Sequence, residues 1–146
     1  MIKNTSSNAL LIEKNKKELG KEIATLRMKR DSSQRGLASK VGLPPSNMKY
    51  VEDGVNAPSP DVYERIINTL KPTAQQRKKM DNYYISIRGT PPPDVCKFLI
   101  ANAEINEAVR IIEGQSLSEQ QLNDIKELFL SFKNNEKGDL ENGKKL

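Results

Sequence analysis

Apolar residues recur every three or four positions along residues 15–89, which is the spacing of helices that bury one face. Residues that can cap a helix precede most of these patterns, and Gly or Pro follows most of them. The sequence predicts helices over residues 15–31, 34–41, 45–53, 60–70 and 74–88. Their candidate N-caps are Asn15, Ser33, Ser59 and Thr73, and their candidate core positions are Leu19, Ile23, Leu26, Leu37, Ala38, Val41, Met48, Val51, Val62, Ile66 and Leu70.

The two ends of the chain differ from this middle part. Residues 1–14 show no clear period, so we expect a flexible N-terminal arm before a domain at residues 15–89. The proline-rich stretch at residues 89–93 predicts a domain boundary. Helical patterns at 94–101, 104–113 and 118–133 predict a small C-terminal helical region over residues 90–133, and residues 134–146 are expected to be disordered. No segment alternates like a strand, so the predicted fold is all-α.

The expected helix at residues 45–53 has one apolar and one polar face. At 100° per residue Met48 and Val51 share a side, and Ser46 lies opposite them with Lys49 and Tyr50 beside it. A preceding helix, a turn at Gly42 and then this helix form the pattern of a helix-turn-helix unit, which places its second helix in the DNA major groove.

With these motifs in place, residues 19–70 resemble the Cro/cI-type (XRE-family) helix-turn-helix domain. The resemblance rests on the spacing of Leu19-Gly20, Ile23, Leu26-Arg27, Ser33-Gln34, Leu37-Ala38, Gly42-Leu43, Glu52, Gly54, Pro58-Ser59 and Leu70. It implies a five-helix lambda-repressor-like DNA-binding domain, and members of the family are typically dimeric repressors.

The resemblance also implies roles for single residues. Gln34 matches a position that contacts backbone phosphate and often supports the reading helix, and Arg27 and Glu52 match a pair that forms a structural salt bridge. The DNA-binding candidates are Gln34, Pro45, Ser46, Asn47, Lys49, Tyr50, Gly54 and Asn56. Of these, Gly54 and Asn56 lie in the loop after the reading helix, where backbone N–H groups and a side-chain amide meet phosphate.

The start of the reading helix departs from the family pattern. Pro44 and Pro45 stand where a Ser or Thr N-cap is usual, and Pro44 has no side-chain oxygen to cap with, so we expect Asn47 to supply the missing cap. Lys49 could contact guanine or phosphate or be plainly solvated, and Tyr50 could contact a thymine methyl or phosphate or pack on the surface.

Charge and composition narrow the function. The formal net charge is +5, but residues 1–89 hold 17 Lys and Arg against 9 Asp and Glu, whereas residues 90–146 hold 7 against 10. A basic front half favours a polyanion partner. The chain has no His and one cysteine, Cys96, which excludes imidazole catalysis and His-containing metal sites, so we expect no enzyme, no cofactor and no metal.

The sequence therefore predicts a sequence-specific transcription regulator that binds the major groove of double-stranded DNA, most simply a dimeric repressor of its own or a neighbouring operator. The alternative is an antitoxin-like protein-interaction module that sequesters a protein partner. The C-terminal region would form a homodimer, bind an antirepressor, a toxin or a protease, or extend the core of one monomer. The longest early apolar run, residues 9–12, is too short to span a membrane, so we expect a cytoplasmic protein.

Overall fold

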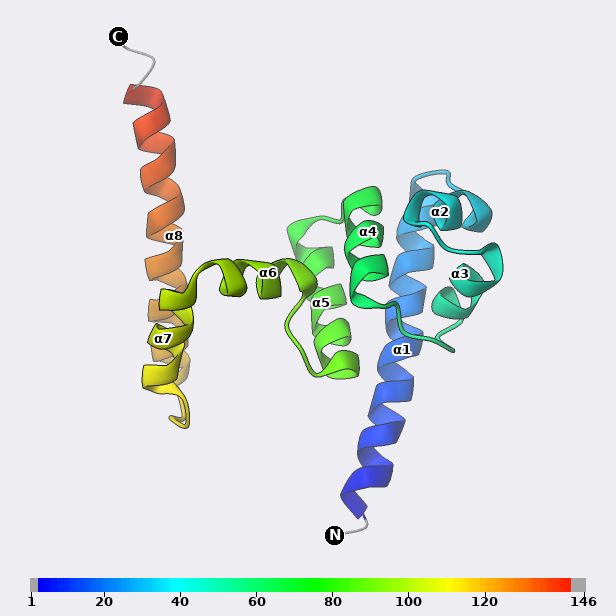
Figure 1. The fold of residues 1–146 in the computed structure, drawn as a ribbon, viewed down its shortest axis with the longest axis horizontal. Helices are drawn as coiled ribbons and strands as arrows, with labels where there is room; N and C mark the ends of the chain where they lie inside the picture. Colours follow the sequence, from blue (N-terminus) through cyan, green and yellow to red (C-terminus); the bar gives the residue numbers. More distant parts are fainter. Residues whose placement is uncertain (1–2, 143–146) are drawn as a thin grey trace. The chain divides into compact units, whose positions relative to one another are not determined.

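The computed structural model describes residues 3–142, and the side chains of residues 7–135. Within this range the chain forms eight α-helices and no strand (Figure 1). The helices are α1 (Lys3–Lys29), α2 (Gln34–Val41), α3 (Pro45–Glu52), α4 (Pro60–Leu70), α5 (Ala74–Arg88), α6 (Pro93–Ala101), α7 (Ala103–Ile112) and α8 (Glu119–Asn142). They divide into two compact units, Met1–Ala103 and Glu104–Leu146.

The caps predicted for the middle helices are present. Ser33 accepts a hydrogen bond from the Gly36 N–H at 2.9 Å, and Ser59 caps α4 directly before Pro60. Thr73 and Gln76 form both bonds of a capping box at the start of α5. Because these motifs act within one turn, the local sequence fixes where these three helices begin.

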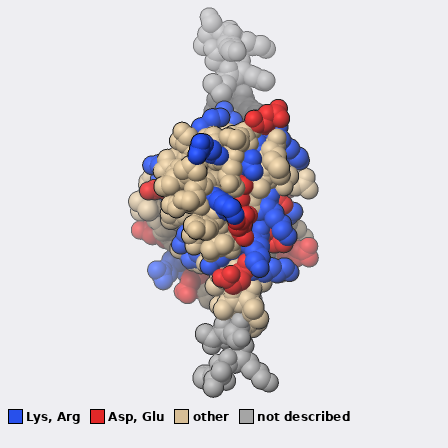
Figure 2. Space-filling model, turned by 90° about the vertical axis from the view of Figure 1, so that its right-hand side faces the viewer, with Lys and Arg blue, Asp and Glu red and all other residues tan. Residues whose placement is uncertain are grey.

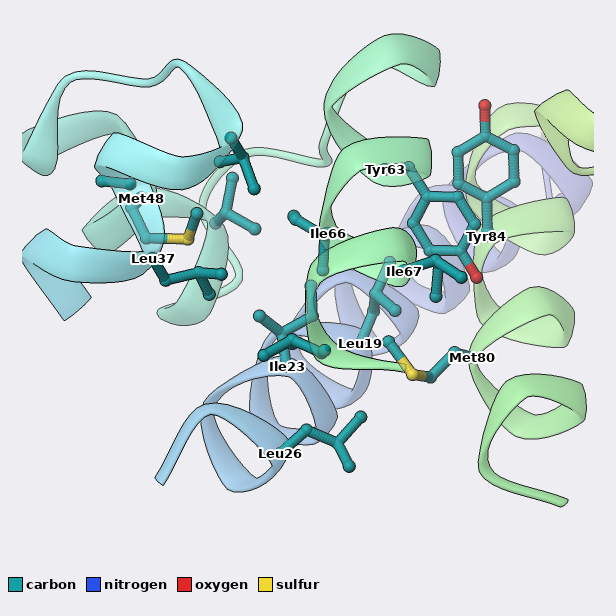
Figure 3. Packing of buried hydrophobic residues seen from close by; sticks show 14 residues of the cluster. Leu19, Ile23, Leu26, Leu37, Met48, Tyr63, Ile66, Ile67, Met80 and Tyr84 are labelled. Atoms are coloured by element: carbon teal, nitrogen blue, oxygen red, sulfur yellow. The ribbon is translucent and has the colours of Figure 1, made fainter. Parts of the chain in front are cut away.

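The core of the first unit is aliphatic with two aromatic rings. Fourteen apolar side chains from α1, α2, α3, α4 and α5 are buried, and Figure 3 shows them converging between these helices. Tyr63 of α4 and Tyr84 of α5 stack at the edge of this core, with ring centroids 4.3 Å apart. The Tyr63 hydroxyl donates to Asp81 at 2.6 Å, and burial, together with this hydrogen bond, raises the pKa of Tyr63 far above its ordinary value.

The first helix begins much earlier than predicted. The expectation of a loose arm is wrong over residues 3–14, which continue α1 without a break, and so is the expected cap at Asn15. Residues 1–2 of the expected arm lie outside the described part of the chain. Asn15 lies inside the helix and is only 8% exposed. No Gly or Pro interrupts residues 3–14, so the helix propagates past the stretch that packs on the domain.

The expected boundary at residues 89–93 is also displaced. Pro92 and Pro93 are buried and open α6, which belongs to the first unit. Two ion pairs hold α6 there, from Arg77 of α5 to Asp94 at 3.0 Å and from Lys97 to Glu64 of α4 at 2.6 Å. The compact unit therefore ends at Ala103 and not at Gly89.

The C-terminal unit contains α7 and α8, which run in opposite directions on either side of a short turn (Figure 1). Ser118 and Gln121 exchange the predicted capping bonds at the start of α8. The tail expected to be disordered from residue 134 instead continues α8 as far as Asn142. Residues 143–146 of that expectation lie outside the described part of the chain.

Candidate nucleic-acid interface

The helix expected to read DNA is α3, an eight-residue helix that follows α2 after a turn at Gly42. Gly42 adopts the expected left-handed conformation with φ of +71° and donates its N–H to the end of α2. Met48, Val51 and Glu52 are the buried residues of α3, and Met48 lies against Leu37 of α2 in Figure 3. The opposite side of α3 therefore faces solvent.

The exposed side of α3 carries the residues that the sequence singled out. Pro45, Ser46, Asn47, Lys49 and Tyr50 are all exposed, and Tyr50 keeps 46% of its surface in solvent. Short polar groups, one cation and one phenol ring therefore lie around the solvent-facing side of α3, which is a surface able to meet base edges.

The expectation that Asn47 caps α3 is wrong. Pro44 occupies the N-cap position, and no side chain caps this helix. The backbone N–H groups of Asn47 and Met48 donate to the Pro44 carbonyl at 3.0 and 3.2 Å, as in an ordinary first turn. The amide of Asn47 is thus not used as a cap and stays on the exposed surface.

Lys49 has an intrahelical acidic partner. Its Nζ lies 2.7 Å from Oδ2 of Asp53, and the two side chains are 63% and 47% exposed. The hydrogen bond that Lys49 donates to the Asp53 carboxylate raises the pKa of Lys49 above its ordinary value. The pair stands at i and i+4, the spacing at which opposite charges meet on a helix, so the sequence contains the signal for it although it is not among the predictions above.

Three helices meet at the carboxylate of Glu52. Arg27 of α1 donates from Nε to Oε1 at 2.6 Å and from Nη2 to Oε2 at 3.2 Å, and Gln34 of α2 donates to Oε2 at 2.7 Å. Only 14% of the Arg27 side chain and 5% of the Glu52 side chain are exposed. Arg27 also donates to the Ser32 carbonyl at 2.9 Å, so the network fixes α1, α2 and α3 against one another.

This network changes the picture of Gln34. The family resemblance implies that Gln34 contacts a backbone phosphate and also supports the helix that follows. In the structure, one of its side-chain N–H groups donates to Glu52. Gln34 is half-buried at the first position of α2. A carboxamide carries two N–H donors, so support of α3 leaves one donor for another partner.

Gly54 is a packing residue. With φ of +73° it ends α3, and a Cβ placed on it would lie 2.5 Å from the Cα of Lys17 in α1. The N–H groups of Gly54, Val55 and Asn56 already donate to carbonyls of α3, those of Val51 and Tyr50. The backbone donors that we expected to face phosphate are therefore used to close the helix, and the exposed Asn56 side chain is the candidate left in this loop.

Gly20 makes a similar close approach between α1 and α3. A Cβ on Gly20 would lie 2.6 Å from the Val51 carbonyl oxygen and would also clash with the Glu52 carbonyl. The C-terminal end of α3 therefore rests directly on the backbone of α1. Two glycines, Gly20 and Gly54, thus allow α3 and the loop after it to approach the backbone of α1 closely.

Several arginines of the basic front half donate hydrogen bonds to backbone carbonyls of the same chain. Arg30 donates to the carbonyls of Leu70 and Lys71, Arg65 to that of Val41, and Arg88 to those of Ala57 and Pro58. Figure 2, viewed from the side on which α2 and α3 lie, shows Lys and Arg mixed with Asp and Glu beside wide uncharged areas. Arg35 and Lys40 of α2, the helix before α3, are exposed cations that are not among the residues predicted to bind DNA.

The comparison with family models bears on this part of the chain. Residues 18–79 match the model of a helix-turn-helix domain. The match supports a helix-turn-helix domain built from α1 to α5. Neither the curated proteins nor the solved structures contain a match to the chain.

Two further properties concern the described residues only. None of their helices is long and apolar enough to cross a membrane. Their Cys, Asp and Glu side chains nowhere gather in a group of three or more that could hold a metal ion.

Proposed function

We propose that this protein is a sequence-specific DNA-binding transcription regulator, acting as a dimeric repressor at its own or a neighbouring operator in the cytoplasm. Helices α1 to α5 would form the five-helix lambda-repressor-like arrangement of the XRE family. The observation that carries the proposal is the exposed polar face of α3, held in place by the buried Arg27–Glu52 pair within a helix-turn-helix domain.

In this proposal the exposed α3 residues read bases in the major groove. Ser46 and Asn47 can donate to or accept from base edges, and Tyr50 can contact a thymine methyl group or a phosphate. Pro45 offers apolar contact alone. Lys49 would exchange its bond to Asp53 for a guanine or a phosphate, so Asp53 weakens non-specific attraction and leaves more of the affinity to base contacts.

Phosphate contacts would come from residues around α3. The second N–H of Gln34, the amide of Asn56 and the exposed cations Arg35 and Lys40 are the donors that flank the helix. Such contacts fix the register of the domain on the duplex. A two-fold dimer would place two reading helices at half-sites about 34 Å apart.

The second candidate function is a protein-interaction module that sequesters a protein partner such as a toxin, an antirepressor or a protease. The proline at the start of α3 and the ion pair of Lys49 with Asp53 favour it, because both reduce the number of free hydrogen-bond donors that α3 presents to DNA. The exposed Arg35 and Lys40 and the polar face of α3 favour DNA.

Fluorescence anisotropy tests the choice. The full chain is titrated into duplexes that flank its own gene and into scrambled duplexes, across a salt series. The proposal expects one flank to bind at least about 10³-fold more tightly than scrambled DNA. Equal and steeply salt-dependent binding to all duplexes would contradict sequence-specific binding at this locus. Absence of binding at low salt would support the protein-interaction module.

Two matched variants locate the site. Lys49→Ala and Lys78→Ala each remove one exposed lysine from the same unit, but Lys78 lies on α5, away from α3 in Figure 1. Lys49→Ala should weaken operator binding about 10-fold or more, because a good base contact contributes roughly 1–3 kcal/mol. Lys78→Ala should change it much less, and equal effects of the two variants would remove α3 from the interface.

A further inference from the structure

The C-terminal unit buries almost none of its apolar side chains. Among residues 104–135, whose side chains the structure describes, no residue is buried. Many large apolar residues of α7 and α8 are more than a third exposed, including Val109, Ile111, Ile112, Leu122, Leu128, Phe129, Leu130 and Phe132. Two helices with so little buried surface lack the packing on which most helical stability in proteins depends.

The apolar residues of both helices follow the spacing of a coiled coil. On α8, Leu122, Ile125, Phe129 and Phe132 succeed one another at intervals of three, four and three residues. On α7, Ile105, Val109 and Ile112 follow at intervals of four and three. Alternation of three and four is the a and d pattern of helices that pack side by side in bundles. We call these seven residues the seam.

The exposed apolar surface is large enough for a stable interface. The exposed residues of the seam leave on the order of 500 Å² of apolar surface in solvent, which is roughly the apolar share of the about 800 Å² that each partner contributes to a standard protein interface. A patch of this size lies at the upper end of what soluble monomers expose and is often functional.

The arrangement favours a second copy of the same chain as the occupant. Both helices of the unit carry a seam of the same period, so two copies related by a two-fold axis present matching surfaces to each other. The charged residues nearest the α8 seam are Lys126 and Lys133, whereas Glu113 directly follows the α7 seam. Opposite charges therefore flank the two kinds of helix, which is the complementarity that sets partners in such bundles.

We propose that α7 and α8 pack against α7 and α8 of a second copy to form a four-helix bundle with the seam at its centre. This inference deepens the proposed function, because it names the surface on which the dimer of the proposed repressor forms. Ile111 and Leu130 lie away from the seam at 100° per residue and stay at the periphery of the bundle.

The test compares nearby exposed residues within and outside the seam in the full chain. Phe129→Glu and Leu130→Glu place the same charge on α8 at positions that are 59% and 52% exposed, and only Phe129 belongs to the seam. Val109→Glu and Ile111→Glu form a second pair on α7. Sedimentation equilibrium measures the molar mass and the dimer dissociation constant of each variant in the absence of DNA.

We expect a wild-type dimer and at least about a 100-fold rise in the dissociation constant for Phe129→Glu and Val109→Glu, because each would bury an unpaired charge. Leu130→Glu and Ile111→Glu should stay dimeric. A wild-type chain that is monomeric at about 100 µM would overturn the proposal, as would equal effects within each pair. Because no DNA is present, these outcomes are independent of whether α3 reads an operator.

Discussion

The Arg27→Ala substitution tests the network that holds α3 against α1 and α2. It removes both hydrogen bonds that Arg27 makes to Glu52, at 2.6 and 3.2 Å, and leaves a carboxylate with 5% of its side chain exposed. Of the hydrogen bonds described to Glu52, the one donated by Gln34 would then remain. The variant also loses the bond that ties α1 to the Ser32 carbonyl.

The expected destabilisation is large because the loss is that of one partner in a buried pair. Removing one side of such a pair costs about 3–5 kcal/mol, since the other charge keeps its desolvation penalty. For a domain of this size, about 1 kcal/mol shifts the melting temperature by at least 4 °C. Arg27→Ala should therefore lower the melting temperature by about 12 °C or more.

Circular dichroism during urea and thermal unfolding measures the effect, with Lys21→Ala as the control. Lys21 lies on the same helix and pairs with Glu18 at 3.4 Å, but 72% of its side chain is exposed, so its loss should cost under about 1 kcal/mol. Arg27→Met combined with Glu52→Met should recover much of the stability, because an apolar pair carries no desolvation penalty. If Arg27→Ala and Lys21→Ala unfold alike, the buried network does not stabilise the domain.

Two further substitutions test the packing of the first unit, both by chemical unfolding. Gly54→Ala should cost at least about 2 kcal/mol, because the new Cβ meets the Lys17 backbone and φ is +73°. Gly89→Ala shares nearly the same φ, +68°, in open space, so it should cost about 1 kcal/mol, and equal losses would refute the steric argument. Tyr63→Phe removes the 2.6 Å bond to Asp81 and should cost about 1.5–3 kcal/mol, whereas a loss under about 0.5 kcal/mol would show that this bond contributes little.

Signals within one helical turn made much of the first unit predictable. Ser33, Ser59 and Thr73 act on N–H groups three residues away, so the sequence places the starts of α2, α4 and α5 without reference to tertiary structure. The start of α1 carries no such signal. Asn15 has the right side chain for an N-cap, but it is buried within a helix that already begins at Lys3.

The docking of α6 could not be read from the sequence. Three consecutive prolines are typical of a linker, yet Pro92 and Pro93 are buried and begin a helix. The ion pairs that hold this helix join residues 17 and 33 positions apart, Arg77 with Asp94 and Lys97 with Glu64. Such pairings depend on how α4 and α5 already lie in the domain.

In the candidate interface, too, features within one helix are predictable from the sequence, whereas contacts between helices are not. Helical periodicity alone shows that Ser46, Lys49 and Tyr50 face away from Met48, because one angle per residue determines the exposed side. The hydrogen bond from Gln34 to Glu52 and the close approach of Gly54 to Lys17 join different parts of the fold, so helical periodicity does not predict them.

The structure also bears on why the proposed repressor needs its C-terminal unit. Helix α3 is eight residues long and has no side-chain cap, so it owes its order to Met48, Val51 and Glu52 rather than to its own stability. The surface around it mixes both signs of charge, and its one lysine is paired with Asp53. A single domain of this kind gains little from phosphate attraction. Joining two domains through the seam makes the second contact with DNA intramolecular, which raises avidity without any new contact. In the proposed dimer, Phe129 and Phe132 therefore support operator binding although they lie outside the helix-turn-helix domain.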